Sequence, residues 1–407
     1  MLSSLGGPGR LLNFDERMKT PSLGLVMGFW FISNVLVIAW WWADISDRFL
    51  PGVLRYAGIA FFVSAALAPL VLLFKVRRSF FNPVVLGLLV CCCLALSITA
   101  HEANLLRERL QFSLDHEREF AHIDAVEGVI RPLIARITEV YVQILGDDHT
   151  RGGSTFHTHI VANYMFDSLS FLAVFALATL LLSPTASWLC LLTFAFYTQI
   201  AIYPGRMGPV FIAGGLFWQL FLLVSRQYPA AIISGLIISF GRTDVVFASA
   251  FVLLSLAAFE RRWPTPKEWG LFGLLVGISI AVPKILIWMH PGTDFRSFLI
   301  THGDYFSKLV VNLLTMKLAV AIASPVLAIV IVRTFALTRT MAVVLPAGLV
   351  HVGIVFVIAD FSETRLIIPA LTALAFVASE GLGKLLEIGA ADRGVTTTQD
   401  ASLADGH

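Results

Sequence analysis

Long apolar runs separated by short polar loops dominate the chain between residues 23 and 383. A hydrocarbon core of about 30 Å needs about 20 consecutive apolar residues in a helix, and most of these runs approach that length. We therefore predict an all-α polytopic membrane protein with about twelve membrane segments. The segments cover residues 23–43, 54–74, 82–100, 160–182, 186–203, 208–224, 229–241, 243–259, 269–288, 309–332, 341–359 and 366–383.

The seventh run, residues 229–241, is too short to cross a bilayer. The next run begins at once, after the polar sequence Gly241-Arg242-Thr243-Asp244. Irregular backbone at membrane depth is tolerated only where protein or water surrounds it. We therefore predict that residues 229–241 and 243–259 form one hairpin that does not fully cross, with Arg242 at its tip.

The composition excludes a soluble protein, because 57% of the residues are hydrophobic and only 14% are charged. Residues 1–22 are polar, and the first apolar run is too long for a signal peptide, so we expect no cleavable leader. The four cysteines lie inside apolar runs, which predicts buried or lipid-facing thiols rather than disulfides. The net charge of +2 gives no indication of nucleic-acid binding, and we expect no such partner.

Basic residues predict the orientation, because cytoplasmic loops carry an excess of Lys and Arg. With the N-terminus inside, the inner segments hold 14 basic residues, whereas the short outer loops hold few, namely Arg48, Arg206, Arg296, Lys308 and Arg365; the Arg242 tip also lies on the outer face. Both termini are thus predicted to be cytoplasmic. Residues 1–22 form the N-terminal segment, 23–383 the transmembrane domain with outer loops 101–159 and 289–308, and 384–407 a disordered tail.

The large outer loop, residues 101–159, contains apolar residues at steps of three and four between Val126 and Leu145. This spacing predicts an amphipathic helix of about twenty residues. It either lies on the membrane surface or packs on the bundle as a lid.

A charged run precedes this helix and includes Asp115, Glu117 and Asp124. A carboxylate here can act as a general base or coordinate a divalent cation between phosphates. The alternative is a solvated helical face. We predict no certain cofactor, and a divalent cation remains an open alternative.

A second polar stretch follows the helix, with His149 and Arg151 before Gly152-Gly153-Ser154. Backbone N–H groups of such a stretch can wrap a phosphate, and an ordinary flexible turn is the alternative. The spacing of His149, His157 and His159 fits no common zinc pattern.

Arg242 and Asp244 lie between two apolar runs with no soluble loop to hold them. An isolated charge at depth costs at least ~2.5–3.5 kcal/mol. The two side chains either pair with each other, or Arg242 binds a lipid-linked phosphate through its planar fork. Arg206 is a weaker candidate for the same role. Lys284 can snorkel to the outer interface.

The segment Asp360-Phe-Ser-Glu363-Thr-Arg365-Leu-Ile-Ile-Pro369 is a second charged stretch, at the predicted outer mouth of the last two membrane segments. Acids and a base at such a position are costly and rarely accidental. Arg365 is predicted to contact a phosphate, and Glu363 to orient it.

These residues resemble those of GT-C type glycosyltransferases, integral-membrane enzymes that use polyprenyl-phosphate sugars. Glu363-Thr-Arg365-Leu-Ile-Ile-Pro369 is similar to the family's late Glu-x-Arg-(Phe/Tyr)-x-x-Pro pattern. Arg242-Thr-Asp244 is similar to the arginine and acid that open a helix in the middle section. One long outer loop with a surface helix completes the resemblance, which covers roughly residues 83–383.

The resemblance implies transfer of a sugar from a lipid-linked donor to a glycan, lipid or protein acceptor on the outer face of a bacterial inner membrane. It implies a base among Asp115, Glu117 and Asp124 and phosphate ligands among Arg206, Arg242 and Arg365. The family's long loop usually follows its first helix, whereas here two extra segments, residues 23–43 and 54–74, precede it. The loop also lacks an early acidic pair, so Asp44 or Asp47 is an alternative base.

Two other functions fit the same pattern. A transporter or flippase of a lipid-linked glycan or small solute would line its path with Lys284, Lys317, Arg242 and Asp244. Against it, no inverted pair of broken helices is evident in the two halves. A non-catalytic subunit with the same fold is the third alternative.

Overall fold

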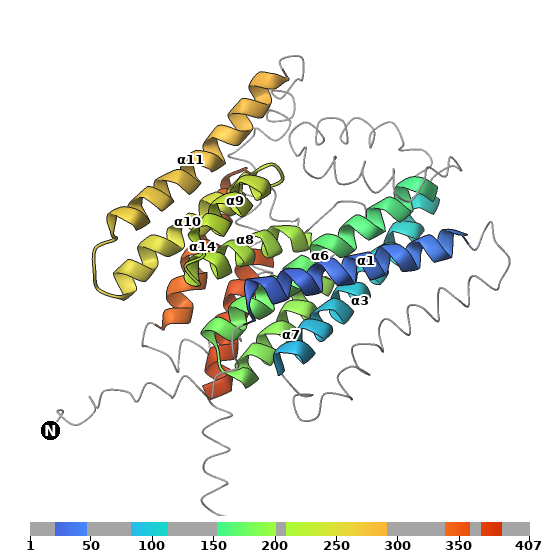
Figure 1. Cartoon of the computed structure of the whole chain (residues 1–407), viewed down its shortest axis with the longest axis horizontal. Helices are drawn as coiled ribbons and strands as arrows, with labels where there is room; N and C mark the ends of the chain where they lie inside the picture. The colour runs from blue at the N-terminus through green and yellow to red at the C-terminus, as the bar shows by residue number, and fades with distance from the viewer. Residues whose placement is uncertain are drawn as a thin grey trace, which may run out of the picture.

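A computed structural model describes residues 21–46, 83–112, 153–200, 209–290, 338–358 and 368–384. All regular secondary structure in these ranges is α-helix, as Figure 1 shows. The prediction of an all-α chain is confirmed for this part of the molecule. Its helices are α1 (Leu23–Ser46), α3 (Pro83–Phe112), α6 (Gly153–Leu181), α7 (Pro184–Ile200), α8 (Pro209–Val224), α9 (Tyr228–Ser239), α10 (Thr243–Phe259), α11 (Pro266–Met289), α14 (Arg339–Ile358) and residues 368–384.

The helix bounds differ most from the predicted segments around the long loop. Helix α3 continues to Phe112, and α6 already begins at Gly153, so both ends of the predicted loop 101–159 are helical. Residues 101–112 are rich in Leu, Ala, Glu, Arg and Gln, which are strong helix formers. The apolar run at residues 82–100 therefore predicted the apolar part of α3 but not the end of the helix at Phe112.

Helix α6 is the centre of one half of the structure and packs against α1, α3, α7 and α8. Phe171 and Phe175 on α6 are fully buried, and the Phe171 ring meets Phe194 of α7 edge to face at 4.9 Å. A Cβ atom at Gly87 would lie 1.9 Å from the Phe175 ring. Only glycine therefore allows α3 to approach α6 this closely.

Neighbouring helices alternate in direction because tight turns join them at residues 182–183, 225–227 and 240–242. Contacts along α10 and α14 show the same antiparallel order. Asp244 at the start of α10 meets His351 well along α14, whereas Ser255 near the end of α10 donates a hydrogen bond to the Ala342 carbonyl at the start of α14.

The start of α14, the end of helix 368–384 and the α6–α7 turn lie together. Thr338 donates a hydrogen bond of 2.8 Å to Glu380, and a Cβ atom at Gly383 would lie 2.8 Å from Ala186. The end of α10 joins them through its contact with Ala342. The turns that follow α6, α8 and α10 therefore share one end of the bundle.

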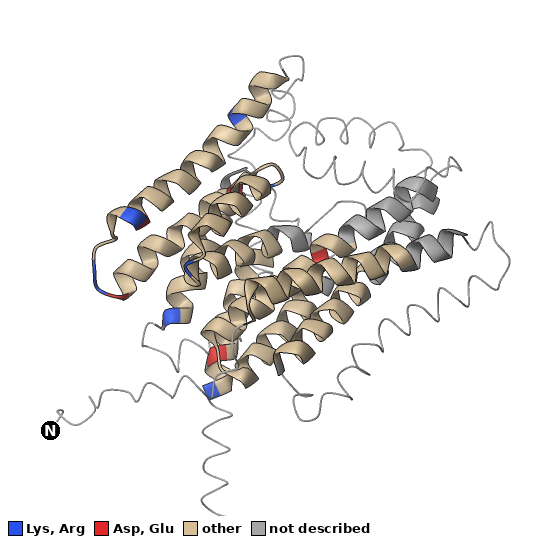
Figure 2. Cartoon of the chain, in the orientation of Figure 1, with Lys and Arg blue, Asp and Glu red and all other residues tan. Residues whose placement is uncertain are grey.

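This end, which we call the basic end, carries six of the eight Lys and Arg side chains that the structure describes; the other two are Arg242 and Lys284. Figure 2 shows blue residues gathered along this side of the molecule. The six are Arg226, Arg261, Arg262, Lys267, Arg339 and Lys384.

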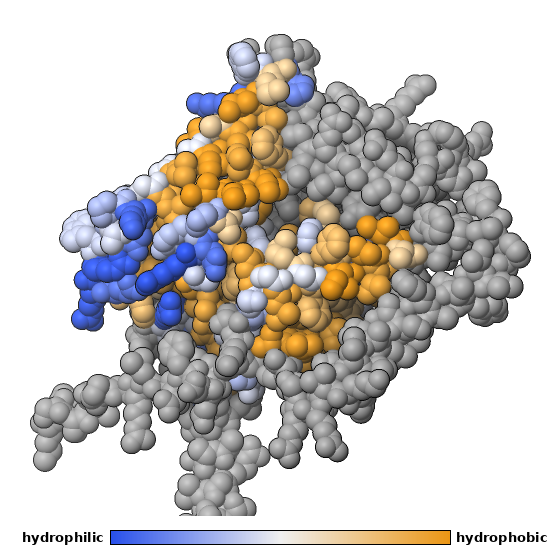
Figure 3. All heavy atoms as spheres, viewed as in Figure 1, coloured by the Kyte–Doolittle hydropathy of each residue, from blue (hydrophilic) through white to orange (hydrophobic). Residues whose placement is uncertain are grey.

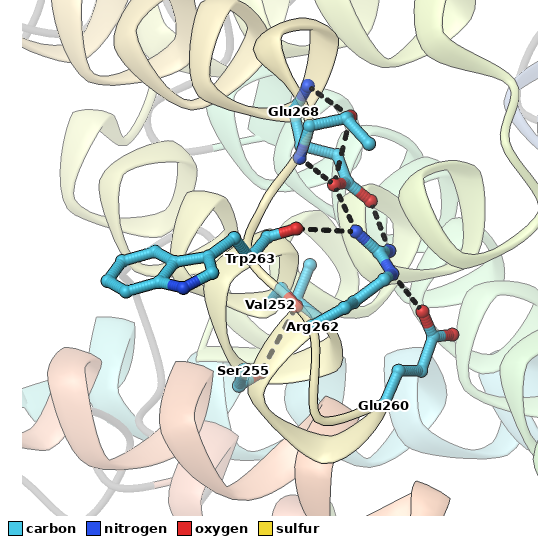
Figure 4. A network of polar contacts seen from close by, with 7 residues as sticks. Val252, Ser255, Glu260, Arg262, Trp263 and Glu268 are labelled. Atoms are coloured by element: carbon cyan, nitrogen blue, oxygen red, sulfur yellow. Dashed lines mark hydrogen bonds and ion pairs between the residues drawn. The ribbon is translucent and has the colours of Figure 1, made fainter.

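The α10–α11 loop at the basic end is fixed by a network around Arg262 (Figure 4). Arg262 donates to Glu268 through two guanidinium nitrogens at 2.6 Å, and to Glu260 at 2.6 Å. These bonds raise the pKa of Arg262 further. Thr265 and Glu268 form a capping box that starts α11. Because Arg262 bonds to a carboxylate on each side of the turn, the network holds the shape of this loop.

Two helices in the described part of the chain contain stretches long and apolar enough to cross a membrane, Tyr164–Leu181 within α6 and α11. The α6 stretch is 78% buried, whereas α11 is only 28% buried at the edge of the bundle. Figure 3 shows an apolar surface that borders the hydrophilic loop of the basic end. Exposed apolar side chains on α11 include Leu274, Ile280, Ile285, Ile287 and Met289.

Candidate functional site

Arg242 and Asp244 form a bidentate ion pair at the α9–α10 turn. The Arg242 Nε donates to Asp244 Oδ1 at 2.9 Å, and Nη2 donates to Oδ2 at 2.7 Å. Their side chains are 15% and 12% exposed, so the pair is mostly shielded but still accessible. Of the two alternatives that the sequence left open for these residues, the structure shows the pair.

The chain around the turn sets this geometry. The Arg242 backbone is extended (φ −151°, ψ 96°) at the N-cap of α10, and its N–H donates to the Ile238 carbonyl at 2.7 Å. Asp244 follows in the first turn of α10, where the partial positive charge of the helix N-terminus stabilises a carboxylate. Arg242 and Asp244, which are only two positions apart in the sequence, can therefore pair across the turn.

His351 of α14 is the third member of the site. Its side chain is fully buried, and Nε2 lies 3.2 Å from Asp244 Oδ2, off the direction of a good hydrogen bond. The imidazole Nδ1 has no hydrogen-bond partner among the described residues. The imidazole is therefore close enough to donate to Asp244 after a small rotation.

A second buried polar atom without a partner in the described structure lies close by in sequence. It is the hydroxyl of Ser239, the last residue of α9 and only 2% exposed. Leaving a buried donor or acceptor unsatisfied costs about 1–3 kcal/mol. Within the described structure, His351 beside the pair and Ser239, five residues before Asp244, thus carry buried polar atoms without a partner, and an unseen water, ion or ligand is one explanation for such atoms.

The site is recessed within the bundle. Asp244 contacts a residue seven positions before α14 ends at Ile358, which is about 10 Å along the helix axis. Helix α9 has only 12 residues, or about 18 Å. The α9–α10 turn therefore does not reach as far along the bundle axis as the far ends of the longer helices α11 and α14. A short helix thus holds a charged pair inside the bundle.

The chemistry of this arrangement suits a negatively charged, oxygen-rich ligand. A guanidinium presents its donors in a planar fork that matches a carboxylate and a phosphate equally well. Asp244 occupies one edge of the fork and holds its orientation. The N-terminus of α10 adds a positive partial charge at the same turn.

Arg242 and Asp244 are the predicted site residues that the structure brings together. The remaining candidates all lie outside the described residues: Asp115, Glu117, Asp124, His149, Arg151, Arg206, Glu363 and Arg365. Their approach to Arg242 stays a prediction.

Lys284 is one of the residues that the transporter alternative places along its path. It is exposed on the peripheral helix α11, which fits a side chain that snorkels. Lys317, the other predicted lysine, lies outside the described residues.

The sequence analysis did not single out His351 or the buried acid Asp167. Both interrupt predicted membrane runs, residues 341–359 and 160–182, and a titratable side chain inside such a run is itself a signal. All four cysteines are free. Across the residues that the structure describes, no group of three or more His, Cys, Asp and Glu side chains is arranged to hold a metal ion.

Comparisons with known proteins add no relative. No protein-family model matches the chain, and neither a curated protein nor a solved structure matches it.

Proposed function

We propose that the chain is a membrane-embedded glycosyltransferase that moves a sugar from a polyprenyl-phosphate donor to an acceptor on the outer face of a bacterial inner membrane. The observation that carries this proposal is the recessed Arg242–Asp244 pair beside His351. In this function Arg242 binds the donor phosphate, Asp244 holds its guanidinium in place, and His351 lies against Asp244.

A bilayer around the bundle agrees with the surface of α11. Trp269 and Trp288 are exposed near its two ends and are 19 residues apart, which is about 28 Å. Tryptophan is enriched at both membrane interfaces, and this spacing matches a hydrocarbon core of about 30 Å. The basic end then faces the cytoplasm, and the α9–α10 turn lies toward the outer side, within the depth of the membrane.

The transfer reaction needs a base and a stabilised leaving group. One of Asp115, Glu117 and Asp124 takes the proton of the acceptor hydroxyl while its oxygen attacks the anomeric carbon of the sugar. The bond from that carbon to the phosphate oxygen breaks, the phosphate keeps the electron pair, and the configuration inverts. Arg242, together with Arg206 and Arg365, stabilises the charge that develops on the phosphate.

Binding of the lipid phosphate tests the role of Arg242. The full-length protein in lipid nanodiscs should bind polyprenyl phosphate and not the uncharged polyprenol. Arg242→Gln should weaken this binding at least tenfold, whereas Lys284→Gln, which changes an exposed cation on α11, should leave it unchanged. Equal binding of alcohol and phosphate, or unchanged binding by Arg242→Gln, would contradict the proposal.

Turnover tests the base. Asp115→Asn, Glu117→Gln and Asp124→Asn should be assayed singly for transfer from a panel of polyprenyl-phosphate sugars. One of these three variant proteins should lose transfer activity but still bind polyprenyl phosphate. Normal turnover by all three would exclude this base assignment and direct attention to Asp44 or Asp47.

A transporter of a lipid-linked glycan is the second candidate, and the buried acid Asp167 is the observation that favours it. Intramembrane carboxyl groups are typical of proton relays in transporters. Flux of a labelled polyprenyl-phosphate sugar across proteoliposomes, without a transferred product, would support this alternative.

A further inference from the structure

Asp167 is a buried acid far from any turn, in the middle of α6. It is 2% exposed, and its Oδ2 accepts a hydrogen bond of 2.8 Å from the Thr99 hydroxyl of α3. Asp167 follows 14 residues after the start of α6, and Thr99 follows 16 residues after the start of α3. Both groups therefore lie deep between two packed helices.

No opposite charge faces Asp167 from the described side chains of the helices around it. In α1, α3, α6, α7 and α8 these side chains include no Lys, Arg or His and no other Asp or Glu. The other titratable side chains that the structure describes on these helices are thiols and phenols. They are Cys91, Cys92, Cys93, Tyr164, Cys190 and Tyr197.

The neighbouring residues of α6 continue this polar region toward α1. The Asn34 amide of α1 donates to the Ser168 hydroxyl at 3.3 Å, and its own Oδ1 is buried with no partner in the described structure. Ser170, one turn further on, approaches α8 so closely that a Cβ atom at Gly214 would lie 2.0 Å from the Ser170 hydroxyl. Polar side chains of α1 and of α3 therefore each bond to adjacent residues of α6 inside an apolar bundle.

Among the side chains that the structure describes, an ionised carboxylate at this position has none of the counter-charge that buried charges need. A neutral carboxylic acid fits it, because the Thr99 hydroxyl donates to one oxygen and the other oxygen carries the proton. We propose that Asp167 is a proton-binding site inside the bundle. It releases its proton to water only when the packing of α1, α3 and α6 opens, and a cation or water must then satisfy the carboxylate.

This site is separate from the Arg242 site and does not depend on the proposed transfer reaction. It uses α3 and α6, whereas the Arg242 site uses the α9–α10 turn and α14. Proton binding at Asp167 would couple the packing of the first half of the bundle to pH.

Infrared spectroscopy of the full-length protein in nanodiscs tests the proposal. At neutral pH the wild-type spectrum should contain the C=O stretch of a protonated carboxyl group, and Asp167→Asn should remove it. Thr99→Val should shift this band to higher frequency, because the hydroxyl donor is lost. Glu380→Gln, which changes an acid at the basic end, should leave the band in place.

Three results would overturn the proposal. The first is a difference spectrum between wild type and Asp167→Asn that shows only carboxylate stretches at neutral pH. The second is loss of the protonated band when sodium replaces a bulky organic cation, which would identify a sodium site instead. The third is a band that does not shift in Thr99→Val, which would exclude Asp167 as the source of the band. This third measurement tests the proposal even if Asp167→Asn does not fold.

Discussion

Asp244 and Asp167, one partly exposed and one buried, differ in how their charge is met. Asp244 begins a helix at a turn, pairs with the Arg242 fork and lies beside His351. Asp167 lies in the middle of a helix and has the Thr99 hydroxyl as its hydrogen-bond partner. A carboxylate can be retained at the first position because a cation and a helix N-terminus are built around it. At the second, the same residue type is best accommodated as a neutral acid.

The largest expected effect is a loss of stability when Asp244 is removed. Asp244→Ala leaves the Arg242 guanidinium shielded without its carboxylate, and breaking such a pair costs about 3 kcal/mol. The free energy of unfolding, measured by denaturant titration in mixed micelles, should fall by about that amount. The double variant Arg242→Met/Asp244→Leu should recover most of the loss. A single variant as stable as the wild type would show that the pair is solvated.

The next effect concerns the shape of the cation. Arg242→Lys keeps the positive charge but loses the planar fork, so one of two hydrogen bonds to a phosphate disappears. Binding of polyprenyl phosphate to the nanodisc protein should weaken about tenfold, or ~1.4 kcal/mol. Lys284→Arg on the exposed face of α11 is the matched control. Equal affinity of Arg242→Lys and wild type would mean that only the charge matters.

Thr99→Val should have a smaller effect, because it removes one hydrogen bond without adding a charge. We expect a loss of about 1 kcal/mol in the free energy of unfolding. Thr193→Val is a suitable control, since Thr193 bonds only to a carbonyl of its own helix, that of Leu189. An equal loss in both variants would remove the special role of the Asp167 contact.

Asp167→Asn should change stability least, by less than about 0.5 kcal/mol at neutral pH. The amide oxygen still accepts the Thr99 hydrogen bond, and the amide matches a neutral acid in size and charge. Asp244→Asn, with the same chemical change, should be clearly less stable because Arg242 loses its counter-charge. If the two substitutions were equally costly, the contrast between the two sites would fail.

Local patterns predicted the α9–α10 hairpin well. The predicted run 243–259 coincides with α10, because a polar turn precedes it and a charged loop follows it. The Arg242–Asp244 pair was also within reach, since the two residues are neighbours across one turn. The end of α3 was not, because residues 101–112 mix charged and apolar helix formers, and hydropathy measures suitability for lipid rather than helix length.

The long-range contacts were beyond the sequence. Thr99 and Asp167 are 68 residues apart, and Asp244 and His351 lie on separate helices joined through a long stretch of chain. Whether such pairs meet depends on how each helix is rotated about its axis. That rotation is set by packing details such as the Gly87–Phe175 contact, which apolar periodicity alone does not determine.

A structure of the nanodisc protein with a bound polyprenyl-phosphate sugar tests the central claim most directly. Cryo-electron microscopy with a rigid antibody fragment would resolve the phosphate. The account predicts that a phosphate oxygen lies within hydrogen-bond distance of the Arg242 guanidinium, about 2.7–3.2 Å, with the Asp244 contact retained. A phosphate bound away from the α9–α10 turn, with Arg242 and Asp244 unchanged, would contradict it.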